Sequence, residues 1–336
     1  MRKKLGFIFI VLVVVGVVLG AKFVSKEEKT ASSLTKISLV LDWQPSAYHA
    51  PLFLAKEKGY FKDNGLDIEF RIPSDPVTVL QTVASGKDDF GLNYPADVLT
   101  ARDKGVPVVS IMALIQHPLI SFATLKDSGI AEPNDLVGKK IGLPAVIPTT
   151  ENILSSMLKA QEKSLEDVQI IDVGYDVVPS LIGEKVDAVL VYWGTETVLL
   201  ESQGFSINTM RAQDYGVPDY YELLFITNEE KISKNPTLVH KFIGAVSRGY
   251  EYALKNPKEA LDAMKKEKPE VDYDFQARSM DVYLPLMKPP NGLFGWQEEQ
   301  KWVDFADWMK ENDLISKDLD VKAAFDNSFV ENAAKK

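Results

Sequence analysis

Short apolar segments alternate with helix-like segments along most of the chain, and this alternation is the strongest constraint on its fold. The first helix-like segments end at single glycines, Gly59, Gly86 and Gly105, as is common at helix ends. Such alternation is typical of βαβ units, so it predicts an α/β fold with mainly parallel sheets. The expected strands are residues 37–41, 66–70, 90–94, 106–115, 139–143, 168–173, 188–192 and 223–227.

An internal echo predicts two similar halves. Residues 87–94 and 185–192 share Lys, Asp and Tyr at identical spacing, and an acid, Asp97 or Glu196, follows each Tyr. Chance similarity is the alternative for so short an echo. From residue 235 the pattern is helical. We therefore expect two lobes with hinges near residues 125 and 227 and a helical C-terminal segment packed on the first lobe. Lobe 1 would comprise residues 37–125 plus 228–330, and lobe 2 residues 126–227.

Residues 1–21 are a candidate export signal or membrane anchor. Arg2, Lys3 and Lys4 precede a run of apolar residues and glycine that extends to Ala21. Cleavage and retention both stay open, but the absence of cysteine excludes a lipid anchor. The basic flank predicts that all following residues lie outside the cytoplasm. Residues 22–36, rich in Lys, Glu, Ser and Thr, are expected to form a tether.

Composition argues against several classes of function. A chain without cysteine has no disulfides, thiolate metal sites or cysteine nucleophiles. Its three histidines, His49, His117 and His240, lack metal-binding spacing, so no metal is expected. Neither a GxxxxGK(S/T) nor a GxGxxG motif occurs, so no nucleotide cofactor is expected. The net charge of −10 argues against a nucleic-acid partner.

Aromatic and acidic residues recur at the carboxyl ends of three expected strands. In open α/β sheets, ligands bind at these strand ends. Indole and phenol faces offer stacking area, and carboxylates accept hydrogen bonds from amino groups or protonated ring nitrogens. The pattern favours a flat, nitrogen-rich ring that is uncharged or weakly cationic. The residues concerned are Asp42, Trp43, Tyr94, Asp97, Tyr192, Trp193 and Glu196.

Further candidates lie at helix starts and in a loop. They are His49, near an expected helix start, Thr149, Thr150 and Glu151, which open a helix, and Tyr220 and Tyr221, which lead into the last strand. Amides at the helix opened by Thr149 are expected to be able to hold a polar ligand group. Each candidate has a structural alternative: aromatic packing at a sheet end or lobe surface, acids that serve a helix dipole, and threonines that cap a helix.

Short motifs spread over residues 37–330 resemble one family. They include Asp42-Trp43-Gln44-Pro45, His49-Ala50-Pro51-Leu52, Gly59-Tyr60-Phe61, Pro95-Ala96-Asp97-Val98-Leu99, Tyr192-Trp193, residues 215–222 and Phe294-Gly295-Trp296-Gln297. In this combination the chain resembles the solute-binding proteins of the thiamin-pyrimidine-precursor family (ThiY-like).

This resemblance implies a fold, a function and roles for residues. The fold would be the type II periplasmic-binding-protein fold, whose two lobes close over a ligand, and the partner would be an ABC permease. The ligand would be a thiamin-related pyrimidine, formylaminopyrimidine or hydroxymethylpyrimidine. By this similarity Trp43 would stack on the pyrimidine, Tyr94 and Tyr192 would flank it, and Glu196 would bind the ring nitrogen and amino group. The protein would be a monomer without enzymatic activity.

The chain also departs from the family pattern. Ser46 stands where an Asn commonly follows the proline in the family. Gly194-Thr195 stands where an Asn-His pair often precedes the acid, and the loop of residues 144–150 has a sequence particular to this chain. These departures leave the ring substituent open. The alternatives are a binding protein for riboflavin or another heterocycle, and an extracytoplasmic sensor module. A pyrimidine-forming synthase of fungi shares the fold, but its resemblance near His49 is loose, and its cysteine-rich motif cannot occur here.

Overall fold

The computed structural model describes residues 34–75, 78–174, 176–288 and 292–334. The expected signal or anchor, residues 1–21, lies outside the described residues, as does nearly all of the expected tether. The first strand begins at Thr35, so Thr35 and Lys36 belong to the fold and not to the tether. No helix in these four ranges is long and apolar enough to cross a membrane.

Ten strands form two five-stranded sheets within the described residues. The first sheet has the order β2-β1-β3-β10-β4 and the second the order β7-β6-β8-β5-β9. In each sheet one strand, β10 or β5, runs antiparallel to both of its neighbours, and the other pairings are parallel. The sheets are therefore mixed, although mainly parallel as expected. The strands are β1 (Thr35–Val40), β2 (Leu66–Arg71), β3 (Phe90–Asn93), β4 (Val108–Ile115), β5 (Ile120–Leu125), β6 (Lys140–Leu143), β7 (Gln169–Asp172), β8 (Ala188–Tyr192), β9 (Ile207–Arg211) and β10 (Leu223–Asn228).

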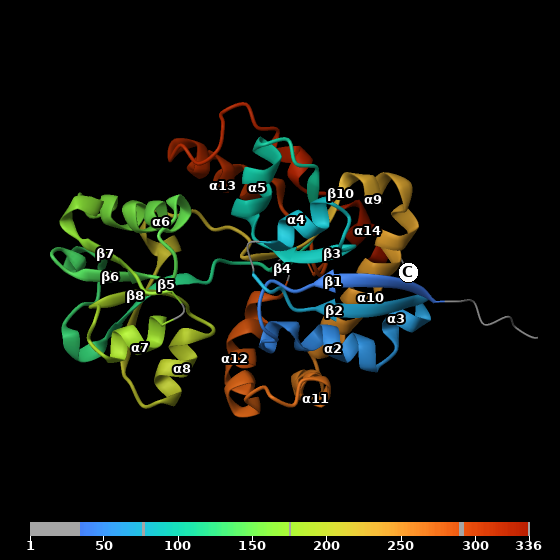
Figure 1. Ribbon diagram of the computed structural model, residues 1–336, viewed down its shortest axis with the longest axis horizontal. Coiled ribbons are helices and arrows are strands. Elements are labelled where there is room, and N and C mark those ends of the chain that lie inside the picture. Colours follow the sequence, from blue (N-terminus) through green and yellow to red (C-terminus); the bar gives the residue numbers. More distant parts are fainter. Residues whose placement is uncertain (1–33, 76–77, 175, 289–291, 335–336) are drawn as a thin grey trace, which may run out of the picture. The chain divides into compact units, whose positions relative to one another are not determined.

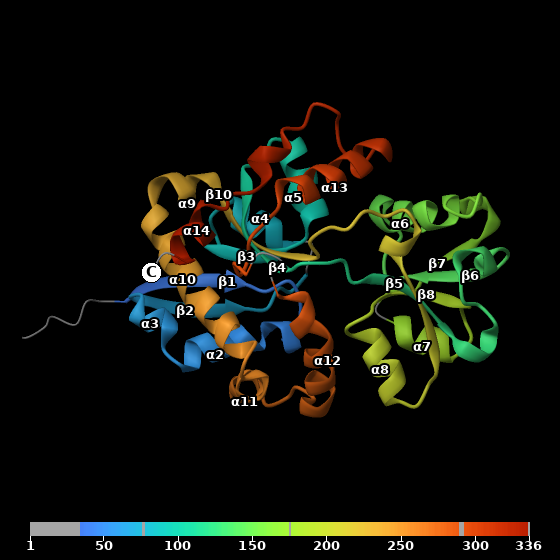
Figure 2. The same cartoon turned by 180° about the vertical axis from the view of Figure 1, so that it is seen from behind.

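Helices cover both faces of each sheet. Figure 1 shows α4 and α5 on one face of the first sheet and α2 and α11 on the other. Both views place α6 on one face of the second sheet and α7 and α8 on the opposite face (Figure 1 and Figure 2). The helices are α2 (Ala50–Glu57), α3 (Tyr60–Asp63), α4 (Val79–Ala84), α5 (Pro95–Asp103), α6 (Pro148–Lys159), α7 (Val177–Ile182), α8 (Glu196–Ser202), α9 (Glu229–Lys234), α10 (Pro236–Ala253), α11 (Pro257–Glu267), α12 (Tyr273–Leu286), α13 (Glu299–Glu311) and α14 (Ser328–Ala334).

Local sequence explains where the first elements begin and end. α2 carries Pro51 in its first turn, where the missing N–H of proline leaves no helical hydrogen bond unmade. Gly59 follows this helix with φ +78°, a left-handed conformation that favours glycine. In β3, Gly91 allows close packing, because a Cβ there would lie 2.7 Å from Val83 Cγ2. The expected helix start near His49 and the glycine stop are both confirmed.

The lobe boundaries differ from those expected. β5 pairs with β8 and β9 in the second sheet, and β10 pairs with β3 and β4 in the first. The chain therefore crosses between lobes at residues 116–119 and again within residues 212–222, earlier than 125 and 227. At the first crossover, β4 and β5 are both mainly apolar and buried, so hydropathy does not distinguish which sheet each strand joins. Below, lobe 1 denotes the first sheet with its helices and lobe 2 the second.

The C-terminal helices contact both lobes. α10, α11 and α14 pack against lobe 1, through contacts with α2 and β4. In contrast, α13 contributes Phe305 and Trp308 to an apolar cluster that includes Ile153 and Leu154 of α6 in lobe 2. The indole N–H of Trp308 also donates to Ser156 Oγ at 3.0 Å. The C-terminal segment was expected to pack on lobe 1; α10, α11 and α14 do so, whereas α13 also packs on lobe 2.

Candidate functional site

Asp42, just after β1, is the centre of a buried hydrogen-bond network. Its side chain is 3% exposed, and Oδ2 accepts the hydroxyls of Tyr48 at 3.0 Å and Tyr94 at 3.1 Å. Its other oxygen, Oδ1, lies 2.8 Å from His49 Nε2. The carboxyl ends of β1 and β3, which are parallel neighbours, meet at one sheet edge and bring Asp42 and Tyr94 together. These three partners satisfy the buried carboxylate, so it positions the tyrosines, which differs from the direct ligand contact expected.

His49 also has a supporting role. The backbone N–H of Ser46 donates to Nδ1 of the ring at 3.0 Å, so Nδ1 carries no proton. The proton is therefore on Nε2, which donates to Asp42, and the imidazole is neutral. The ring is fully buried. With both nitrogens engaged and no exposed surface, His49 is a structural residue, which corrects its assignment as a ligand contact.

Tyr94 and Tyr192 bring one phenol from each lobe into this region. Tyr94 precedes α5 in lobe 1 and Tyr192 ends β8 in lobe 2, and both side chains are partly exposed. Burial raises the pKa of each hydroxyl well above its usual range, and Asp42 near Tyr94 and Glu222 near Tyr192 raise these pKa values further. Tyr192 also contributes to the raised pKa of Tyr94. Both hydroxyls therefore stay protonated at neutral pH. Both rings pack against the same apolar cluster, which includes Tyr283.

A tight turn at residues 192–196 forms the lobe 2 side of the site. Thr195 N–H donates to Tyr192 O at 2.9 Å, and Glu196 Oε2 accepts the N–H of Tyr192 at 2.9 Å. The turn is attached to the first crossover, because Trp193 donates its backbone N–H to Leu119 O at 3.0 Å and its indole N–H to Pro118 O at 3.2 Å. Burial raises the pKa of Glu196, and the N–H groups that it accepts partly oppose this. The turn thus presents Tyr192 and Glu196 from a fixed backbone.

Trp43 and Asp97 are the exposed candidates in lobe 1. The Trp43 side chain is 38% exposed, which argues against a role as a plug of the sheet end. Asp97 lies in the first turn of α5 and reaches solvent. The surrounding protein nevertheless raises the pKa of this carboxyl to about 6, and water offsets part of that effect. Both side chains are therefore accessible to a ligand from solution.

Glu222 is a buried residue that the sequence analysis did not include among the candidate ligand contacts. It lies on the second crossover, is 3% exposed, and accepts the N–H of Leu119 on the first crossover at 2.6 Å. Burial raises the pKa of its carboxyl to about 8, and the nearby Asp42 adds to the rise. Its position directly before the apolar run 223–227 was the sequence feature that could have indicated its burial. Below, the interlobe cluster denotes Asp42, Tyr94, Tyr192, Trp193, Glu196 and Glu222.

Tyr220 and Tyr221 do not line the site as expected. They are only 4% and 2% exposed. The ring of Tyr220 stacks on Phe305 of α13 at 4.3 Å between centroids. The hydroxyl of Tyr221 accepts the N–H of Glu298 at 2.5 Å. Both tyrosines therefore belong to the packing between the second crossover and α13.

Thr149, Thr150 and Glu151 open α6 at the sheet edge that also carries Tyr192, because β6 and β8 are parallel neighbours. Thr150 Oγ1 donates to Ala145 O at 2.7 Å and accepts the N–H of Ile147 at 3.2 Å. These are the hydrogen bonds expected if the threonines only cap the helix. A ligand contact by this segment stays a prediction.

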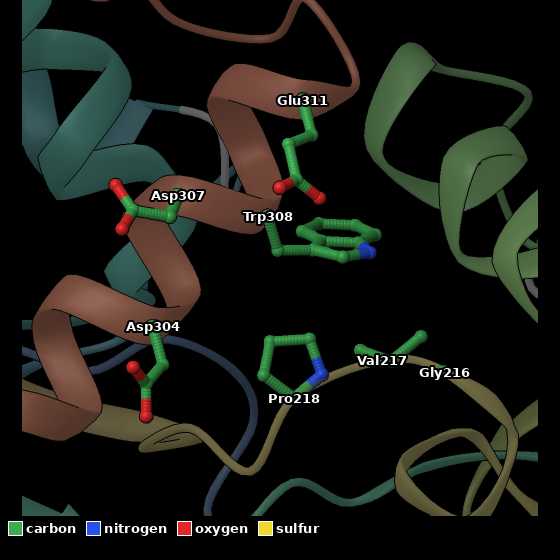
Figure 3. A pocket seen from close by; sticks show the side chains of 7 residues that line it. All are labelled: Gly216, Val217, Pro218, Asp304, Asp307, Trp308 and Glu311. Carbon is green, nitrogen blue, oxygen red and sulfur yellow. The ribbon is translucent and has the colours of Figure 1, made fainter.

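A shallow pocket of about 390 Å³ lies outside the interlobe cluster. Figure 3 shows Trp308 and Glu311 of α13 beside Val217 and Pro218 of the second crossover. Asp304 and Asp307 complete an acidic lining on α13. None of the residues expected to bind a ligand lines this pocket. Within the described ranges, no group of three His, Asp or Glu residues is placed to hold a metal ion.

Comparisons with known proteins agree with this architecture. The family described as "NMT1/THI5 like" matches residues 46–260. A "Formylaminopyrimidine-binding protein" of Halalkalibacterium halodurans is 34% identical over 309 residues, which cover 90% of this chain and 93% of that protein. A "4-amino-5-hydroxymethyl-2-methylpyrimidine phosphate synthase" of Saccharomyces cerevisiae is 33% identical over 253 residues, 72% of this chain and 74% of that one. The similarity to fungal synthases therefore extends far beyond the neighbourhood of His49.

Solved structures confirm the expected fold. The periplasmic aliphatic sulphonate binding protein SsuA of Escherichia coli superposes with a TM-score of 0.70 at 15% identity. The match covers 87% of this chain and 97% of that structure. At such low identity the likeness shows the fold alone, which is the two-lobed periplasmic-binding-protein fold.

Proposed function

Because the chain belongs to the NMT1/THI5-like family, we propose that it is an extracytoplasmic solute-binding protein that captures a thiamin-related pyrimidine for import by an ABC transporter. The ligand class is formylaminopyrimidine or hydroxymethylpyrimidine. One observation carries the proposal: at strand ends where α/β sheets bind ligands, a phenol from each lobe packs against the same apolar cluster, and the Tyr94 hydroxyl donates to the buried Asp42. The relative from Halalkalibacterium halodurans, which bears the name of such a ligand, supports the same class.

Each accessible residue has a distinct role in this proposal. Trp43 offers an exposed indole face on which the ring stacks. Tyr94 and Tyr192 flank the ring, and Glu196 accepts hydrogen bonds from its amino group and protonated ring nitrogen. Three aromatic contacts and one charge-assisted hydrogen bond supply roughly 3 to 7 kcal/mol. Micromolar affinity needs about 8 kcal/mol, so the lobes must also exclude water from the ligand.

Binding without chemistry fits the buried residues better than catalysis does. His49 is fully buried and uses both ring nitrogens inside the protein, so it is not available to a substrate. The chain has no cysteine to act as a nucleophile. The named synthase relatives make an enzyme the second candidate. Recovery of the ligand unchanged after its release separates the two, because an enzyme would convert it and a binding protein would not.

We place the protein outside the cytoplasm, held by residues 1–21 or released after their cleavage. The partner is the permease of an ABC transporter, and the protein is proposed to act as a monomer. The alternative is that the protein is an extracytoplasmic sensor module, whose partner would be a signalling protein. Co-purification with a permease from membranes, in the presence of ligand, supports the transporter assignment.

A thermal-shift screen of the purified protein tests the ligand class. Formylaminopyrimidine or hydroxymethylpyrimidine should raise the melting temperature, and riboflavin should not. Trp43→Ala and Glu196→Gln should abolish the shift. Because 38% of the Trp43 side chain is exposed, its replacement should lower the melting temperature of the ligand-free protein far less than loss of a fully buried tryptophan would. Stabilisation by riboflavin alone, or by none of the compounds, would contradict the proposal.

A further inference from the structure

The turn at residues 192–196 makes a second contact across the lobes. Thr195 Oγ1 of lobe 2 lies 2.5 Å from the hydroxyl of Tyr283, which is on α12 of lobe 1. Tyr283 is 1% exposed. A hydrogen bond this short between two hydroxyls fixes the tip of the turn against α12.

Gly194 allows the two lobes to approach closely at this point. A Cβ at Gly194 would lie 2.7 Å from Cζ and 2.9 Å from Cε1 of Tyr283. Real side chains do not reach such distances, so any larger residue would force the turn and α12 apart. Glycine is therefore required here for the approach of backbone to ring, since no left-handed conformation is involved.

The Tyr283 ring connects this contact to the base of the site. It meets the Tyr48 ring edge-on, with 5.1 Å between centroids. Tyr48 in turn donates to Asp42, which holds Tyr94. A continuous set of contacts thus runs from the lobe 2 turn, through Tyr283 and Tyr48, to the phenol on lobe 1. Because this packing pins the ring, Tyr283 cannot simply rotate away from an added side chain.

We propose that Gly194, Thr195 and Tyr283 form an interlobe latch, which stabilises the closed arrangement of the lobes and positions Tyr192 and Glu196 against the ligand. Tyr283 is a positioning residue in this scheme, because it acts on the ligand through the turn. The effect of the latch on affinity rests on the proposed function. Its effect on the separation of the lobes does not.

The first experiment compares Gly194→Ala with Gly244→Ala. Gly244 lies in α10, where a Cβ would meet nothing within 4 Å, so it is a matched control. Since the chain has no native cysteine, spin labels can be attached through Glu201→Cys on α8 and Glu251→Cys on α10, both at exposed positions. We expect Gly194→Ala to shift the label distance to longer values and to raise Kd for the pyrimidine by roughly tenfold to a hundredfold. Gly244→Ala should change neither.

The second experiment is a double-mutant cycle on the hydrogen bond. Thr195→Val and Tyr283→Phe each remove one hydroxyl and keep the shape of the side chain. Each should weaken pyrimidine binding by about twofold to tenfold, and the double variant should be no weaker than the worse single one. Tyr252→Phe, whose hydroxyl bonds to Glu259 within lobe 1, is the control.

The outcomes separate this inference from the proposed function. If no pyrimidine binds but Gly194→Ala lengthens the label distance, the ligand class fails and the latch stands. If pyrimidine binds and Gly194→Ala changes neither the distance nor Kd, the latch is overturned and the ligand class stands. Fully additive effects of Thr195→Val and Tyr283→Phe would overturn the direct pairing of the two hydroxyls.

Discussion

Replacing Glu222 by glutamine should remove a pH-dependent loss of stability. The carboxyl is 3% exposed, and burial raises its pKa from 4.5 to about 8. Between these two values the folded protein holds a proton on Glu222 that the unfolded chain has released. Folding therefore binds a proton in this range, and the free energy of unfolding falls as the pH rises from about 4.5 to about 8.

The expected magnitude follows from the size of the rise in pKa. Each pH unit in this range lowers the free energy of unfolding by about 1.4 kcal/mol, and the loss from Glu222 is at most about 5 kcal/mol above pH 8. Raised pKa values at Asp97 and Glu196 act in the same direction in both proteins. The difference between wild type and Glu222→Gln therefore isolates Glu222. Glutamine keeps an oxygen that can accept the N–H of Leu119.

Urea unfolding at five pH values from 5 to 9 measures this difference. Near pH 5 the two proteins should be about equally stable, and at pH 9 the variant should be more stable by roughly 3 to 5 kcal/mol. Glu201→Gln, at an exposed position on α8, is the control and should show no such trend. A difference between wild type and Glu222→Gln that stays constant from pH 5 to pH 9 would refute the reasoning.

Two further substitutions test the base of the site and the packing beneath it. Asp42→Asn places an amide where the Tyr48 and Tyr94 hydroxyls and His49 need acceptors. It should lower the free energy of unfolding by about 3 to 5 kcal/mol, as measured in urea. A loss below about 1 kcal/mol would show that the network is dispensable. Gly91→Ala puts a methyl group 2.7 Å from Val83 Cγ2; it should cost about 1 to 3 kcal/mol by the same assay, whereas an unchanged urea midpoint would mean that α4 adjusts freely.

The residues at strand ends could be predicted from the sequence, because hydropathy locates each strand end and the fold class brings such ends together. Asp42, Trp43, Tyr94 and Tyr192 were placed in this way. Which of them touch each other depends on strand order, which hydropathy does not contain. The sharing of Asp42 by Tyr48, Tyr94 and His49 therefore emerged only from the structure.

Burial was the other property that the sequence did not determine. Tyr220, Tyr221 and Glu222 occupy one short segment with loop-like composition. The two tyrosines pack against α13, while the acid is buried between the crossovers. The two crossovers run beside each other, so each buries part of the other. This burial follows from the three-dimensional path of the chain and is not visible in the sequence. The roles of Trp43, Asp97 and Glu196 in binding stay predictions.

The position of β10 has a consequence for biosynthesis. The second sheet is made from one continuous stretch, residues 120–211, whereas β10 fills the gap between β3 and β4 in the first sheet. During synthesis from the N-terminus, the strands of the second sheet are therefore all available before the first sheet has its fifth strand, β10. Until residue 228 emerges, β4 has no neighbour in its own sheet. The lobe that begins first along the chain is thus the last to be completed.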